Sequence, residues 1–131
     1  MNRRMLVDTS MLFVFLLLLD YRYVHNFGHE MLALVFTALF LLHTIWNARW
    51  YRALFRGHWP KQRIVMTGID LLLLFLFLGV ILTGLSFSHT MPIFNIHPPL
   101  WVHRLHRIFG FLMLFVMGLH LGIHWQGIWT K

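Results

Sequence analysis

The sequence predicts an all-α protein, a four-transmembrane-helix bundle with both termini in the cytoplasm. The first observation is composition, because 59% of the 131 residues are hydrophobic and only 11% are charged. The mean hydropathy of +0.69 agrees with this balance. The second observation is that the charged residues cluster between long apolar runs. This pattern is typical of an integral membrane protein.

Four apolar runs predict the helices. Each run extends through semi-polar flanks to the roughly 20 residues that cross about 30 Å of hydrocarbon. The predicted helices cover residues 5–24, 28–50, 64–88 and 101–126. We expect one domain, 1–131. The first run should be a retained helix rather than a signal, because it contains Asp8 and lacks a small-residue cleavage pattern.

The distribution of positive charge predicts the orientation. If the chain crosses the membrane four times, eight of the 11 Lys and Arg residues lie on one side of it. These eight are Arg3, Arg4, Arg49, Arg52, Arg56, Lys61, Arg63 and Lys131. The positive-inside rule assigns that side to the cytoplasm, and we expect a bacterial cytoplasmic membrane. The net charge of +7 therefore indicates membrane topology and no nucleic-acid partner.

Two histidine pairs have the same spacing. HEMLALVFTALFLLH (29–43) and HRIFGFLMLFVMGLH (106–120) each place their histidines fourteen residues apart. At about 100° per residue, fourteen residues end about 40° short of four full turns, so both histidines lie on one helix face. The corresponding rise is about 21 Å, which separates two levels along each helix.

The chain shows a weak internal duplication. When the two histidine helices are aligned, the pairs are Asp8 with Asp70, Ala33 with Gly110, and Asn47 with His124. The sequence therefore predicts two copies of one helical hairpin, with the helices 28–50 and 101–126 parallel. Like histidines are then level with each other: His29 with His106, and His43 with His120.

Facing imidazoles have several uses. They can hydrogen-bond to each other, bind a small metal ion, or ligate a haem iron from both sides. Zinc or copper would need three or four converging ligands, and we expect no acidic third ligand near His120 and His124. The small residues Ala33 and Gly110 leave room for a flat macrocycle against the backbone.

The paired spacings, the HE that opens the helix 28–50 and the terminal HLGIHW resemble the di-haem cytochromes b. That superfamily includes the membrane subunits of formate dehydrogenases and hydrogenases, and the likeness is greatest to a small four-helix branch of it. The resemblance implies two haem b groups. The outer one would be held by His29 and His106, and the inner one by His43 and His120. His25, His103 and His124 stay open as alternative ligands.

Other polar residues have less specific interpretations. Arg104 and Arg107 are candidates to contact haem propionates or to anchor the helix at the membrane surface. In the outer connection, His89, His97 and His103 form either a quinone site or a solvated loop. For Asp8 and Asp70, the options are mutual pairing of their helices, an Arg partner, or proton uptake.

These features together predict an electron-transfer function. We expect a membrane cytochrome b that passes electrons between quinone or quinol and a partner redox protein at the outer face. No catalytic residue is assigned, because the chain is better suited to an electron-transfer subunit than to a complete enzyme. One alternative is a quinol-linked oxidoreductase acting on oxygen species or ferric iron. The other is a haem-free, His-rich metal-binding membrane protein.

Overall fold

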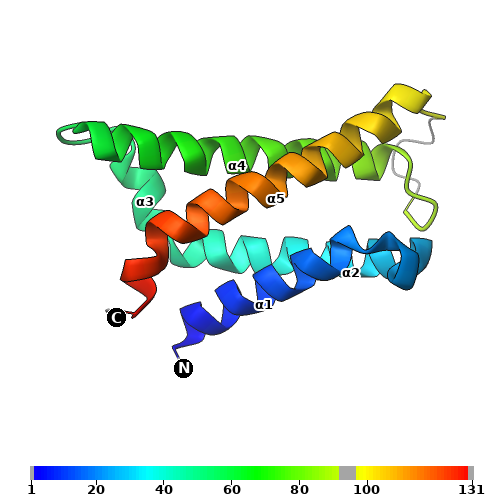
Figure 1. Ribbon diagram of the computed structural model, residues 1–131, viewed down its shortest axis with the longest axis horizontal. Helices are drawn as coiled ribbons and strands as arrows, with labels where there is room; N and C mark the ends of the chain where they lie inside the picture. The colour runs from blue at the N-terminus through cyan, green and yellow to red at the C-terminus, as the bar shows by residue number, and fades with distance from the viewer. Residues whose placement is uncertain (1, 92–96, 130–131) are drawn as a thin grey trace. The chain divides into compact units, whose positions relative to one another are not determined.

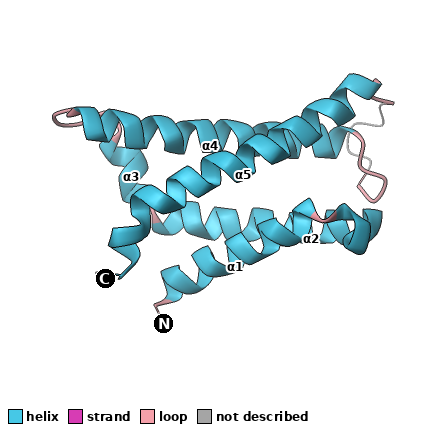
Figure 2. Ribbon diagram, in the orientation of Figure 1, coloured by secondary structure: helices cyan, strands magenta, loops and turns pink. Residues whose placement is uncertain are grey.

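A computed structural model describes residues 2–91 and 97–129 of the chain, and it is helical throughout, with no strand among these residues (Figures 1 and 2). The five helices in this part are α1 (Arg3–Leu19), α2 (Tyr21–Trp46), α3 (Ala48–Ala53), α4 (Lys61–Ser86) and α5 (Leu100–Trp129). Residues 92–96 of the predicted outer connection lie outside the described residues.

The chain divides into two compact units, residues 1–58 and 59–131. The first unit is a hairpin of α1 and α2, followed by the short α3. The second is a hairpin of α4 and α5. In each hairpin, a residue in the first half of one helix bonds to a residue in the second half of the next, so the two helices are antiparallel.

The predicted four-transmembrane-helix bundle is wrong in its helix count. Three helical segments of the described residues are long and apolar enough to cross a membrane: 21–46, 61–86 and 100–125. α1 has 17 residues, which at about 1.5 Å per residue rise only about 26 Å. The placement of both termini in the cytoplasm depended on four crossings and loses its basis.

Asp20 explains why α1 is shorter than the predicted helix 5–24. Its backbone leaves helical geometry at φ −98° and ψ 67°, and its N–H donates to the carbonyl of Leu17. A prediction from hydropathy does not detect this change in backbone geometry. A second irregularity follows at His25, where φ is 57° and ψ is −179°. This conformation strains any residue that has a Cβ atom.

The remaining helix ends follow local chemistry. α2 ends at Trp46, and the side-chain amide of the following residue, Asn47, donates to the carbonyl of His43 at 2.8 Å. The predicted helix 28–50 is therefore divided, and its last residues belong to α3. Pro60, with an extended ψ of 159°, directly precedes α4. Pro99 precedes α5 and accepts the Val102 N–H, because proline is compatible with a helix start and not with its interior.

Both hairpins bury the same positions of the predicted repeat. In the first, Val14 and Phe15 of α1 lie under Phe36 of α2, and the two phenylalanine rings are 5.8 Å apart. The counterparts in the second hairpin, Leu76, Phe77 and Met113, are buried as well. The duplication is therefore present in the packing of each hairpin.

Candidate functional site

The histidine face of each helix is turned toward the other helix of its own hairpin. On α5, Met113 and Met117 lie between His106 and His120 on the same face, and both methionines are buried. Phe36 takes this place on α2 and is also buried. The predicted shared face is thus the packed face of the hairpin, where neighbouring side chains fix the orientation of each imidazole.

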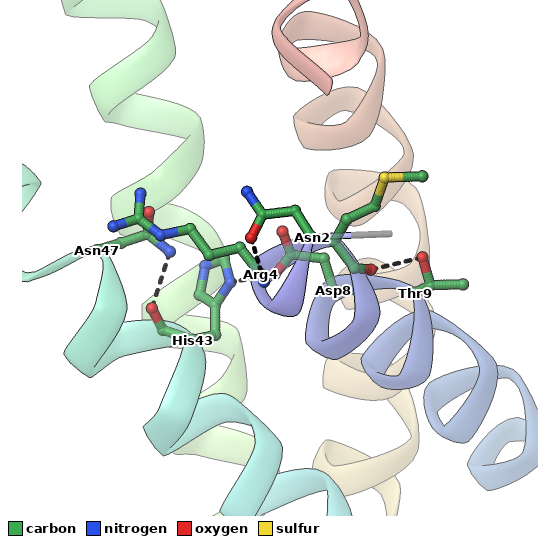
Figure 3. Close-up of polar contacts among 7 residues, drawn as sticks. Asn2, Arg4, Asp8, Thr9, His43 and Asn47 are labelled. Atoms are coloured by element: carbon green, nitrogen blue, oxygen red, sulfur yellow. Dashed lines mark hydrogen bonds and ion pairs between the residues drawn. The ribbon is translucent and has the colours of Figure 1, made fainter. Parts of the chain in front are cut away.

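In the first hairpin, one histidine is bonded to an aspartate. His43 Nδ1 lies 2.7 Å from Asp8 Oδ1, across the contact between α2 and α1 (Figure 3). The His43 and Asp8 side chains are 29% and 42% exposed, so part of the imidazole is accessible for a further interaction.

The second hairpin repeats this pair. His120 Nδ1 lies 2.7 Å from Asp70 Oδ1, and the side chains are 25% and 14% exposed. Asp70 is thus the more enclosed of the two carboxylates. We call the His43–Asp8 and His120–Asp70 pairs the aspartate level.

At the other histidine of the second hairpin, the partners are neutral. His106 Nδ1 lies 3.0 Å from the backbone carbonyl of Val80 and 3.0 Å from Thr83 Oγ1. The Thr83 hydroxyl is itself close enough to the Gly79 carbonyl, at 2.6 Å, to donate to it. We call the positions of His106 and His29 the backbone level.

His29 has the corresponding surroundings in the first hairpin. Its ring lies near the backbone of Leu18 and near Glu30, and Leu18 follows Asp8 by ten residues as Val80 follows Asp70. Tyr21, the counterpart of Thr83, meets the His29 ring edge-on with centroids 5.5 Å apart. The two hairpins therefore surround equivalent histidines at both levels.

These partners determine the tautomer of three of the four histidines. An ionised carboxylate and a backbone carbonyl can only accept hydrogen bonds, so the hydrogen lies on Nδ1 of His43, His120 and His106. The lone pair is then on Nε2, the atom through which a neutral imidazole coordinates a metal or a haem iron. A hydrogen-bond acceptor at Nδ1 is the usual accompaniment of a ligating histidine.

Small residues near the histidines differ in what they accommodate. A Cβ atom on Gly84 would come within 3.2 Å of His106 Cε1, so Gly84 makes room for that ring. A Cβ on Gly110 would meet nothing within 4 Å among the described atoms, so the packing of α4 on α5 does not require this glycine. Ala33, its half-buried counterpart, accepts a hydrogen bond from Thr37 through its carbonyl.

Asp70 also lies near a second histidine. His124 Nε2 is 3.7 Å from Asp70 Oδ1, and ligand atoms of Asp70, His120 and His124 all lie within 4.8 Å of one another. These three residues could hold a metal ion. The expectation that His120 and His124 lack an acidic third ligand was wrong, because Asp70 is distant in the sequence and adjacent in the hairpin.

The other predicted residues lie outside these levels. His25 is exposed at the irregular turn of α2, and Arg104 and Arg107 are exposed on α5. His103 stacks on Phe87 with ring centroids 4.2 Å apart. His89 and His97 are exposed on the connection between α4 and α5. The structure places none of these residues beside the His43–Asp8 or the His120–Asp70 pair.

The sequence interpretation missed the partners of the histidines. It considered pairing between the two aspartate-bearing helices or with an arginine, whereas each aspartate bonds the histidine of its own hairpin. An antiparallel hairpin places the start of one helix beside the end of the next. The positions of Asp8 and His43 near those ends were the available signal.

Comparisons with protein-family models, with curated proteins and with solved structures find no match to this chain.

Proposed function

We propose that this protein is a membrane electron-transfer protein that binds two b-type haems, each through two histidines. The observation that carries the proposal is the repeated fixing of Nδ1 by an acceptor from the neighbouring helix, which leaves the lone pair on Nε2 at the ligating position. His43 and His120 are such imidazoles at the aspartate level, and His106 is one at the backbone level. In this proposal each haem would take one histidine from each hairpin.

Like positions of the repeat are paired in this proposal. His43 and His120, both bonded to aspartate, hold one haem, and His29 and His106 hold the other. The bound haems supply the redox chemistry, while the chain orients the axial ligands and excludes water. Levels about 21 Å apart along each helix would carry an electron across much of a bilayer.

The proposed exchange partners are a quinone or quinol in the membrane and a redox protein in water. The three apolar helices support a membrane location, which we propose to be a bacterial cytoplasmic membrane. Arg104 and Arg107 are exposed near the start of α5, where they would pair with haem propionates by charge.

An optical spectrum tests this function. The full chain is expressed with haem available, purified in detergent, and measured as a reduced-minus-oxidised difference. A low-spin b-type band is expected, with a haem-to-protein ratio that falls when His43 or His106 is replaced by alanine. A preparation without that band would refute the proposal, and replacement of the exposed His97 by alanine is the control.

Asp70, His120 and His124 support a second candidate function, the binding of a divalent transition metal. Two imidazoles and one carboxylate are a common ligand set for zinc and for non-haem iron, and the ion would take the place of the hydrogen between His120 Nδ1 and Asp70. The first hairpin lacks the third ligand, because Asn47 stands at the position of His124. Only the second hairpin therefore has this set among the described residues.

Calorimetry with Zn²⁺ on haem-free protein tests the second candidate. The His124→Asn variant gives the second hairpin the residue that the first one has, and it should lose the binding seen in the unaltered chain. Asn47→Ala is the matched control and should not change zinc binding. Equal binding by both variants and the parent chain would contradict a site at Asp70.

A further inference from the structure

We propose that Asp8 and Asp70 set the two haems apart in potential, lowering the midpoint potential at the aspartate level relative to the backbone level. The inference rests on the proposed function, because it concerns haems that the four histidines would hold. It adds a role for two carboxylates and a preferred direction for the electron.

The first step concerns the aspartate level. Nδ1 of both His43 and His120 is 2.7 Å from a carboxylate oxygen, a short distance typical of a charge-assisted hydrogen bond. Such a bond moves electron density toward the imidazole and raises its basicity as a ligand. A more basic axial ligand stabilises ferric iron more than ferrous iron, which lowers the midpoint potential.

The second step concerns the backbone level. His106 Nδ1 lies 3.0 Å from the carbonyl of Val80 and 3.0 Å from the Thr83 hydroxyl. Neither acceptor has a formal charge. The His29 ring lies near the backbone of Leu18 and near Glu30. The neutral partners of His106 donate less electron density than a carboxylate does, so the potential at this level is higher.

The carboxylate contact occurs in both hairpins, which strengthens the inference. Both histidines proposed for one haem have a carboxylate at Nδ1, whereas His106, proposed for the other haem, has neutral partners. The two contributions at the aspartate level therefore have the same sign and add.

A direction of electron transfer follows. With haem bound at both levels, a single electron would pass from the level of lower potential to the level of higher potential, oxidising one iron by one electron and reducing the other by one. No proton or chemical group needs to move in this step.

Redox titration of the haem-loaded full chain tests the inference. Asp8→Asn and Asp70→Asn keep the size of the side chain and its accepting oxygen while removing the charge. Each should raise the midpoint potential of the haem proposed for His43 and His120, because its ligand becomes less basic. The double variant should raise it further, and the second haem should stay unchanged.

Control variants separate this role from a structural one. His43→Ala identifies the spectral band of the aspartate level, and Thr83→Val removes a neutral partner at the backbone level. Asp8→Glu restores a carboxylate and should return the potential toward that of the parent chain. The low-spin electron paramagnetic resonance signal should change for one haem only, because its axial ligand field weakens.

Several outcomes would overturn the inference. They are an unchanged potential in both Asn variants, equal shifts of both haems, or a downward shift. If an Asn variant binds no haem, Asp8→Glu and Asp70→Glu are titrated instead. These variants keep the carboxylate and move it relative to the histidine, so a midpoint potential equal to that of the parent chain in both would count against the proposal. Absence of haem from the parent chain would refute the proposed function itself, which distinguishes the two failures.

Discussion

Asp70 Oδ1 lies 2.7 Å from Nδ1 of His120, fifty residues further along the chain, and Asp8 makes the same contact with His43. Two carboxylates that would be costly to bury unpaired in a membrane are therefore each bonded to a histidine. The contact directs Nε2 of each imidazole away from the carboxylate. This relationship gives the strongest support to a ligand role for His43 and His120.

Histidine replacements should reveal the pairing of ligands. His43→Ala is expected to halve the haem-to-protein ratio, because one of the two proposed haems would lose a ligand. Adding His120→Ala should lower the ratio no further, whereas adding His106→Ala should remove the remaining haem. The ratio is measured as pyridine haemochrome against protein. Equal losses in the two double variants would contradict the pairing of like positions.

Removal of the carboxylates should destabilise the hairpins unequally. Asp70→Ala leaves a half-buried imidazole without its charged acceptor and is expected to cost about 1.5–3 kcal/mol. Asp8→Ala should cost less, because that side chain is 42% exposed against 14% for Asp70 and solvent screens its interaction.

Thermal unfolding of haem-free protein in detergent measures this difference. Asp20→Ala is the control, since the Asp20 side chain makes no capping hydrogen bond to α2. A larger loss of melting temperature for Asp8→Ala than for Asp70→Ala would show that exposure does not decide the strength of the two pairs.

Close packing of α4 on α5 should make Gly79 intolerant of a side chain. A Cβ there would lie 2.5 Å from ring carbons of Phe109, so Gly79→Ala forces the aromatic ring to move. Overpacking of this kind costs about 1–3 kcal/mol. Gly68→Ala on the same helix meets nothing within 4 Å and is the matched control.

The melting temperature should therefore fall for Gly79→Ala and stay level or rise slightly for Gly68→Ala. Equal behaviour of the two variants would show that the close approach at Phe109 is not a constraint on the hairpin.

Backbone strain at His25 should be removable. With φ at 57° and ψ at −179°, His25 occupies a region that costs a residue with a Cβ about 1–3 kcal/mol. His25→Gly should raise the melting temperature, because glycine adopts this conformation without a clash. His25→Ala keeps the Cβ and should give no rise. A similar gain in both variants would indicate an effect of the imidazole rather than of the backbone.

The helical class and the approximate bounds of α4 and α5 could be predicted from the sequence, because apolar runs marked both helices. The bounds of α2 could not, since this helix begins at Tyr21 rather than at the predicted residue 28. The number of crossings could not be read in this way. It depends on the local geometry at Asp20, where one residue leaves the helical region and shortens α1.

Histidine spacing also predicted which residues share a face, but it did not predict what orients them. Spacing within a helix is a local property. The bonds from Asp8 to His43 and from Val80 to His106 join different helices, and their register depends on how the hairpin packs around Phe36 or Met113. That register is determined by the side chains between the two levels, which periodicity alone does not specify.

Asp8 and Asp70 each fix the tautomer of a histidine in their own hairpin. Each hairpin therefore orients this imidazole by contacts within itself, and a substitution at one aspartate should leave the other pair intact. The two halves of the repeat nevertheless differ next to this position, since Asn47 stands where the second hairpin has His124.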